Sequence, residues 1–353
     1  MSAAAQPTLA TLGWDDGWEA SFAEHLPDGL TPARVSAPHR GGAYDVLTED
    51  GEVRARLPGR TRRAASTADV PVVGDWVALD IAGDSPTIEA VLPRRTKLSR
   101  RAAHDPGADV AREQVVAANV DVVFVTTSLA DAPSPRLLER YLTLAWESGA
   151  RPAILLLKAD LEQDPARVAD ELGEIAGNVP IAVVSTRAGL GLDRVRALLG
   201  PGTTGALVGP SGVGKSTLVN ALVGEDILDT GEVADDGSGR HTTTRRQLVL
   251  LPGGGIVVDN PGIRELHLWL ADEGLDEAFA DITELASRCR FADCGHETEP
   301  GCAIQAALAS GELSRERWAS YRELEQELAE LEERLARRVR SRARRGRPDA
   351  GTP

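Results

Sequence analysis

Lysine is rare in this chain, and one of its three lysines stands in a pattern that could bind phosphate. Lys215 follows Gly209-Pro-Ser-Gly-Val-Gly214 and precedes Ser216 and Thr217, which matches G-x-x-x-x-G-K-[ST]. In this pattern the glycines let the backbone wrap an anion, the lysine neutralises phosphate oxygens and the serine binds Mg²⁺. A plain glycine turn is the alternative, but a short strand before the motif and a helical run after it favour phosphate binding. The predicted contacts are Gly209, Ser211, Gly212, Val213, Gly214, Lys215, Ser216 and Thr217, and Lys215 is also a predicted catalytic residue.

A second predicted phosphate and magnesium element follows downstream. The apolar run GIVV ends in Asp259-Asn-Pro-Gly262, the D-x-P-G pattern of a GTPase switch. A carboxylate at a strand end can hold Mg²⁺, usually through water, and the Gly262 amide can contact a γ-phosphate. Between the two motifs lies Gly-Arg-His241-Thr-Thr243-Thr, whose threonine hydroxyls can complete the Mg²⁺ shell. We favour Thr243, although the register among residues 242–244 stays open.

Base recognition is predicted upstream of these motifs. The run AILLL leads into Lys158-Ala-Asp160, and IAVV leads into Ser185-Thr186. Asp160 can accept from guanine N1 and its exocyclic amine, Lys158 can lie on the base, and the loop of Ser185 and Thr186 can meet the carbonyl edge. K-A-D alone is a weak signal, but its place after a strand strengthens it. Such elements normally follow the phosphate motif, so their position here predicts a cyclic reordering of strands.

All three cysteines fall within fourteen residues, as Cys289-x4-Cys294-x-His296-x5-Cys302. Four soft or borderline ligands at this spacing predict a closed tetrahedral zinc site without a catalytic position. An odd number of cysteines disfavours a disulfide. Three unrelated buried cysteines are the alternative.

The elements that must position these residues change along the chain. Short β-rich runs with turn signals from Gly42 to about Arg101 predict a small β-barrel. Alternating apolar runs and helical segments from Val120 to Val258 predict a parallel sheet with crossover helices, whose ligand loops lie at the carboxyl ends of the strands. Helical patterns surround the cysteines.

Basic residues gather in three places. PGRTRR and LPRRTKLSRR lie in the predicted barrel, and eight arginines without an acidic residue lie between Arg334 and Arg347. RNA phosphate is one partner that such clusters fit. Solvated basic turns, and a helix end that complements its dipole, are the alternatives.

The motif order, with D-N-P-G-I-R-E and G-R-H-T-T-T, resembles the circularly permuted GTPases, and closely the ribosome small-subunit-dependent GTPase A family (RsgA, also called YjeQ). The resemblance implies an N-terminal OB-fold barrel, a permuted GTPase domain, a C-terminal zinc-binding domain, and late maturation of the small ribosomal subunit with subunit-stimulated GTP hydrolysis. It also assigns the orientation of the attacking water to His241. The expected divisions are a flexible leader (1–37), the barrel (38–105), the GTPase domain (106–266), the zinc-binding helical domain (267–333) and a basic tail (334–353).

Two positions depart from the family pattern. Leu157 stands where its base motif usually has asparagine, so one polar contact that braces the base and the neighbouring loops is missing. Ile263 follows the D-x-P-G, where many GTPases place a glutamine, and an aliphatic side chain cannot orient water.

Composition is that of an ordinary globular protein, with 42% hydrophobic residues and a net charge of −15 that argues against nonspecific coating of nucleic acid. No stretch is apolar enough to cross a bilayer, and the N-terminus lacks a secretory pattern, so we expect a cytoplasmic monomer without a membrane partner. The expected function is a GTPase that binds GTP, GDP, Mg²⁺, structural zinc and the rRNA of the small subunit. The alternatives are a phosphotransferase with the same phosphate motif and an RNA-binding scaffold that nucleotide merely stabilises.

Overall fold

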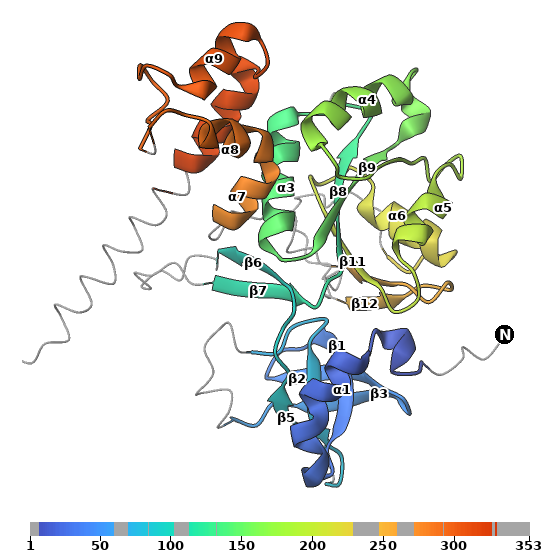
Figure 1. Cartoon of the computed structure of the whole chain (residues 1–353). Coiled ribbons are helices and arrows are strands. Elements are labelled where there is room, and N and C mark those ends of the chain that lie inside the picture. The colour runs from blue at the N-terminus through green and yellow to red at the C-terminus, as the bar shows by residue number, and fades with distance from the viewer. Residues whose placement is uncertain are drawn as a thin grey trace, which may run out of the picture.

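The structure, a computed structural model, describes residues 7–59, 70–83, 85–101, 113–131, 133–228, 247–259, 272–291, 293–326 and 329. A β-barrel, a sheet flanked by helices and a group of C-terminal helices follow one another along the chain (Figure 1). The barrel is closed in the order β1-β2-β3-β5-β4, an OB-like arrangement of five strands. Its strands are β1 (Thr31–Pro38), β2 (Ala43–Thr48), β3 (Gly51–Arg56), β4 (Trp76–Asp80) and β5 (Thr87–Val91).

The N-terminal segment (7–30) is packed against the barrel rather than loosely held. Trp14 and Trp76 lie edge to face with their ring centroids 4.7 Å apart, and Trp18 and Phe22 are buried in the same cluster. The prediction of a flexible leader over 1–37 is therefore wrong for the described residues, because the barrel already begins at Thr31. The helices of this segment are η1 (Ala10–Leu12), α1 (Asp16–Phe22) and η2 (Ala23–Asp28).

A buried arginine joins the barrel to the rest of the chain. Arg34 on β1 is 2% exposed, and its guanidinium donates to the carbonyls of Leu12, of Gly74 at 3.3 Å and of Asn119 at 2.9 Å. Burial lowers the pKa of Arg34 to about 10, a value at which it stays protonated at neutral pH. Asn119 follows the ribbon of β6 (Lys97–Arg101) and β7 (Glu113–Ala118). The Arg34 side chain therefore joins the barrel to the N-terminal segment and to the end of this ribbon.

The central sheet has the order β10-β9-β8-β11-β13-β12, and every neighbouring pair except β12 with β13 is parallel. The strands that come first in the sequence, β8 to β10, thus form one half of the sheet, and β11 to β13 form the other. Its strands are β8 (Val122–Ser128), β9 (Arg151–Leu157), β10 (Ile181–Val183), β11 (Thr204–Val208), β12 (Gln247–Leu250) and β13 (Ile256–Asp259).

Alternate residues of the strands supply two apolar cores. Val123 and Val125 of β8 pack in the cluster that includes α3 and α4, whereas Val122 and Phe124 pack in the cluster of α5 and α6. Helices therefore cover both faces, as a parallel sheet requires. The helices are α3 (Pro135–Glu147), α4 (Pro165–Ala176), α5 (Leu192–Leu198) and α6 (Lys215–Val223), and η3 (Ala159–Leu161) follows β9.

The C-terminal helices extend the first of these cores, since Phe279 and Ile304 belong to the same cluster as α3. Beside it, Arg317 binds Glu139 of α3 at 2.7 Å, and Glu139 is only 2% exposed. Figure 1 shows α7 alongside α3. The helices are α7 (Asp272–Ala278), α8 (Ala280–Ser287) and α9 (Ala303–Ser310), followed by helical residues 315–326.

The predicted fold class is confirmed: a barrel, an α/β domain with permuted motif order, and a helical C-terminal part that carries the cysteines. The predicted boundary between 105 and 106 falls in residues 102–112, outside the described ones. In the described part of the chain we find no helix with the length and apolarity of a membrane span.

Candidate functional site

Predicted ligand residues gather at the edge of the central sheet where parallel strands end. Lys158 and Asp160 follow β9, and Ser185 follows β10. Residues 209–217 follow β11, and Asp259 is the last residue of β13. Because these four strands are parallel, their carboxyl ends share one edge. The edge of a doubly wound sheet is where ligand loops converge.

Residues 209–217, here the phosphate loop, have a backbone that requires glycine. Gly209 has φ 142°, and a Cβ there would lie 2.3 Å from the carbonyl oxygen of Thr126. Gly214 has φ 111° and immediately precedes α6. The loop therefore leads directly into a helix N-terminus, where unpaired amides and the helix dipole favour an anion.

Lys215 is held over the phosphate loop by carbonyl oxygens. Its Nζ donates to Gly209 at 2.8 Å and to Pro210 at 2.6 Å. A phosphate oxygen can replace these neutral acceptors and gains a charge-assisted hydrogen bond. Ser216 is half-buried at the start of α6, and the side chains of Ser211 and Thr217 are exposed. Val213 is buried, so only its backbone is available to a ligand.

The base loop (158–161) carries an oriented carboxylate. The buried Ser185 hydroxyl donates to Asp160 Oδ1 at 2.6 Å and accepts from the Ala188 amide at 3.1 Å. The hydrogen bond from Ser185 lowers the pKa of Asp160, so this exposed group stays an ionised acceptor. Lys158 has φ 59° and is half-buried, and Thr186 is half-buried in the loop after Ser185.

Several predicted residues lie outside the described part of the chain. These are His241, Thr243, Gly262 and Ile263. Asp259 is described at the end of β13, where it pairs in register with Gln247 of the antiparallel strand β12. The Asp259 carboxylate and the Ser216 hydroxyl are oxygen groups of the kind that Mg²⁺ prefers.

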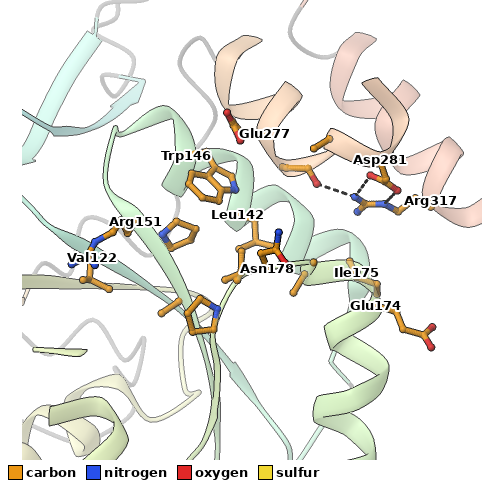
Figure 2. A pocket seen from close by; sticks show the side chains of 18 of the residues that line it. Val122, Leu142, Trp146, Arg151, Glu174, Ile175, Asn178, Glu277, Asp281 and Arg317 are labelled. Atoms are coloured by element: carbon orange, nitrogen blue, oxygen red, sulfur yellow. Dashed lines mark hydrogen bonds and ion pairs between the residues drawn. The ribbon is translucent and has the colours of Figure 1, made fainter. Parts of the chain in front are cut away.

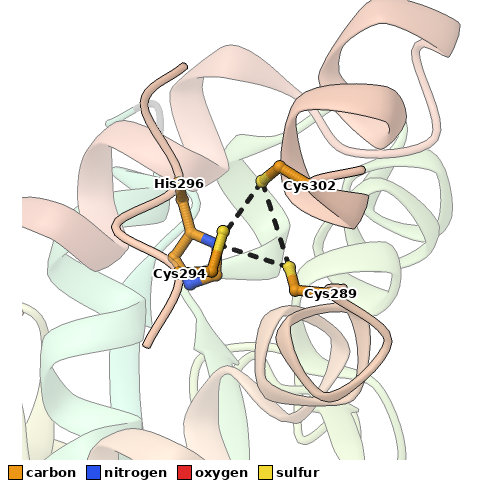
Figure 3. A group of neighbouring side chains, drawn as sticks. All are labelled: Cys289, Cys294, His296 and Cys302. Carbon is orange, nitrogen blue, oxygen red and sulfur yellow. Dashed lines mark hydrogen bonds between the residues drawn. The ribbon is translucent and has the colours of Figure 1, made fainter. Parts of the chain in front are cut away.

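The four predicted zinc ligands come together at the start of α9 (Figure 3). Their ligand atoms all lie within 4.8 Å of one another. His296 Nδ1 is 3.6 Å from Cys289 Sγ and 3.5 Å from Cys302 Sγ, and these two sulfurs are 4.0 Å apart. Tetrahedral Zn²⁺ with ordinary bond lengths requires about 3.6 Å between nitrogen and sulfur and about 3.8 Å between sulfurs. The cysteine cluster (Cys289, Cys294, His296 and Cys302) therefore fits zinc.

Backbone groups support the thiolate form that zinc requires. The amide of Ala303 donates to Cys289 Sγ at 3.3 Å, and that of Gln305 donates to Cys302 Sγ at 3.5 Å. Desolvation raises the pKa of the Cys289 thiol, but hydrogen bonds from the amides of Ala303 and Ile304 and from the thiols of Cys294 and Cys302 together lower it. Gln305 also donates to the His296 carbonyl at 2.6 Å, which fixes the loop that carries the imidazole.

Figure 2 shows the side chains around a large, mostly apolar cavity of about 480 Å³. It is lined at the start of β9 by Arg151 and Pro152, by Trp146 of α3, and by Glu277 and Asp281 of the C-terminal helices. Arg151 and Pro152 begin β9, at the opposite end of this strand from Lys158 and Asp160, so the cavity is not the pocket for the predicted nucleotide.

Most of the basic cluster at 92–101 is engaged within the protein. Arg94 binds the buried Asp75 at 2.7 Å, and Arg95 binds Asp15 at 2.6 Å. Lys97 binds Glu113 at 2.7 Å. These cations hold the barrel, the N-terminal segment and the β6–β7 ribbon, which leaves less of their charge for RNA than the sequence suggested.

Sequence reasoning missed residues that support the site from a distance. Thr126 on β8 donates to the Val208 carbonyl at 2.8 Å and packs against Gly209, so it holds the start of the phosphate loop. Arg317 bridges Glu139 and Asp281, each at 2.7 Å. Neither contact has a local sequence signal, because the partners are far apart in the chain.

Comparisons with known proteins agree with this geometry. The family described as RsgA GTPase matches residues 91–269. A protein of Streptomyces coelicolor named small ribosomal subunit biogenesis GTPase RsgA is 43% identical over 341 residues, which cover 96% of this chain and 91% of that protein. One of Methanosarcina acetivorans with the same name is 44% identical and covers 90% of this chain and 84% of its own length.

Solved structures are similar as well. The crystal structure of YjeQ from Thermotoga maritima has a TM-score of 0.63 at 29% identity and covers 85% of this chain and 99% of its own. YloQ, described as a circularly permuted GTPase, shares the fold with a TM-score of 0.60 at 24% identity, over 86% of this chain and 96% of its own.

Proposed function

We propose that this chain, a GTP-hydrolysing member of the RsgA GTPase family, acts in biogenesis of the small ribosomal subunit. We further propose that the small subunit stimulates its hydrolysis of GTP. The observation that carries the proposal is the meeting of two loops at one sheet edge. Asp160, oriented by Ser185, lies at the same edge as the phosphate loop, although it precedes that loop in the sequence.

The nucleotide-site residues have separable roles in this proposal. Asp160 recognises guanine, with Lys158 and the Ser185–Thr186 loop beside the base. Lys215 and the phosphate-loop amides bind the phosphates and stabilise charge that develops on them during transfer. Ser216, Asp259 and Thr243 would hold Mg²⁺, which supplies further charge neutralisation when bound. His241 would orient the attacking water, since Ile263 has no polar atom for that task.

RNA contact is proposed at one end of the barrel and at the C-terminal arginines. Arg40 in the β1–β2 turn and Arg56 at the end of β3 are exposed, and the register pairs Ala43 with Arg56, so both lie at the same end of the barrel. The sequence continues there with Arg60, Arg62 and Arg63, outside the described residues. The arginines of 334–347 are the second proposed contact with rRNA phosphate.

We further propose one structural zinc ion in the cysteine cluster, a monomer, and a cytoplasmic location. The near-tetrahedral spacing of the ligand atoms supports the zinc, and a set of four protein ligands leaves no position for substrate.

The deciding experiment measures hydrolysis of GTP and ATP by the purified protein, alone and with purified small or large ribosomal subunits. We expect slow GTP turnover that small subunits accelerate and large subunits do not, with a Lys215→Ala variant inactive throughout. GTP turnover that neither particle changes would refute the proposed partner. Equal turnover of ATP would refute guanine recognition by Asp160.

A further inference from the structure

Leu157, the last residue of β9, lies between the base loop and the phosphate loop. It is 3% exposed and belongs to the same apolar cluster as Val213 of the phosphate loop. Its Cδ1 lies 3.8 Å from the position that a Cβ on Gly214 would occupy. Leu157 therefore lies beside the phosphate loop, one residue before the base loop begins.

The other described contacts of the base loop point toward β10. The Ala159 amide donates to the Val184 carbonyl at 3.1 Å, and Ser185 donates to Asp160. The Leu157 carbonyl accepts from Leu129 at 2.8 Å, which fixes the end of β9 beside β8. The Leu157 side chain, which shares one apolar cluster with Val213, thus lies between this group of bonds and the loop after β11.

We propose that Leu157 is a positioning residue that couples guanine recognition by Asp160 to the phosphate loop through apolar packing. The proposal rests on the nucleotide site described above. In this arrangement the packing of Leu157 takes the place of the hydrogen bond that an asparagine side chain would make. The leucine side chain cannot form a hydrogen bond, but a closely packed side chain transmits displacements because protein interiors have little free volume.

The proposal predicts an effect on selectivity as well as on stability. Asp160 must meet two donors of guanine at hydrogen-bond distance, and small displacements weaken such bonds steeply. If Leu157 sets the distance between Asp160 and the phosphate loop, shortening this side chain lets the base and phosphates bind without mutual alignment. The group most affected is then the guanine amine, which only a correctly placed carboxylate can recognise.

The test compares the affinities of GDP and inosine diphosphate, which lacks that amine. We expect Leu157→Ala to reduce the preference for GDP by about fivefold, a coupling of ordinary size for residues in contact. Leu157→Met, which conserves volume, should retain the preference. If the alanine variant does not fold, Leu157→Val provides a milder truncation, which should give a smaller loss of the preference for GDP.

Leu155→Ala is the matched control, because Leu155 is fully buried on the same strand and in the same cluster but lies farther from both loops. It should lower the melting temperature and leave the preference unchanged. Equal loss of affinity for both nucleotides in the Leu157 variants, or an equal change of preference in Leu155→Ala, would overturn the proposal. A wild-type protein that binds the two nucleotides equally would instead refute guanine recognition by Asp160.

Discussion

The nucleotide edge and the cysteine cluster hold their functional groups in different ways. At the edge, Lys215 rests on two neutral carbonyls and Asp160 is exposed, so both groups can exchange these surroundings for a ligand. In the cluster, four side-chain atoms already lie within 4.8 Å of one another, and Cys302 is 5% exposed. A site that must bind and release nucleotide leaves its contacts replaceable, whereas a site for a resident ion brings its ligands together in advance.

Removal of the lysine should break the first site without affecting the second. We expect Lys215→Ala to lower GTP hydrolysis by at least about 100-fold, because a positioned charge no longer stabilises the transferring phosphate. Steady-state phosphate release measures this effect. Zinc content, determined by mass spectrometry of the dialysed protein, should not change, and a parallel loss of zinc would contradict the independence of the two sites.

The converse change should break the cluster alone. Cys302→Ser keeps the size of the side chain but replaces a thiolate with a poor zinc ligand, so zinc should fall from about one ion per chain to near zero. The melting temperature should fall with it. GDP affinity should change by less than about twofold, since distant sites act nearly independently. A large loss of GDP affinity would show that the cluster supports the nucleotide edge.

Removal of the hydroxyl group that donates to Asp160 should weaken guanine recognition at the nucleotide edge and leave the cysteine cluster unaffected. Ser185→Ala removes the donor that orients this carboxylate, and we expect about a fivefold loss of the preference for GDP over inosine diphosphate. The pKa of Asp160 is lowered by Ser185, so wild-type GDP affinity should stay constant as the pH falls from 7 to about 5 and decline only below the ordinary carboxyl range. In the variant the decline should begin at a higher pH. Identical pH profiles would refute the role of Ser185.

The smallest effect on activity is expected at the ion pair that joins α3 to the C-terminal helices. Glu139→Gln removes the buried charge that Arg317 binds, and Arg317 keeps Asp281 as a partner. We expect a loss of about 1–3 kcal/mol in the free energy of unfolding, measured with urea, and little change in GTP turnover. The matched control is Glu171→Gln, which removes an exposed ion pair with Arg167 and should cost less than about 0.5 kcal/mol. Equal costs would contradict the structural role of Glu139.

The sequence predicted those parts of the site that depend on local spacing. The phosphate loop and the cysteine cluster each lie within fourteen residues or fewer of the sequence. Glycine, cysteine and histidine rarely occur at these spacings except in phosphate-binding and metal-binding sites. The base loop required one more inference, because its place before the phosphate loop makes sense only when β9 and β11 lie in one sheet.

Contacts between distant residues could not be predicted in this way. The tryptophans at 14 and 18 gave no regular pattern, and their partner Trp76 lies on the fourth strand of the barrel. The basic run at 92–101 suggested an RNA surface, but Asp15, Asp75 and Glu113 neutralise much of it. Charge along a sequence does not reveal which acidic groups the fold will place beside it.

The hydrogen bonds of the buried Arg34 limit how the barrel could be separated from the rest of the chain. Its guanidinium donates to carbonyls of the N-terminal segment, of the barrel and of Asn119 in the link between β7 and β8, all inside the protein. One buried side chain of the barrel therefore satisfies acceptors in all three segments. The barrel could accordingly not be removed or exchanged without leaving a buried cation or its carbonyl acceptors unpaired.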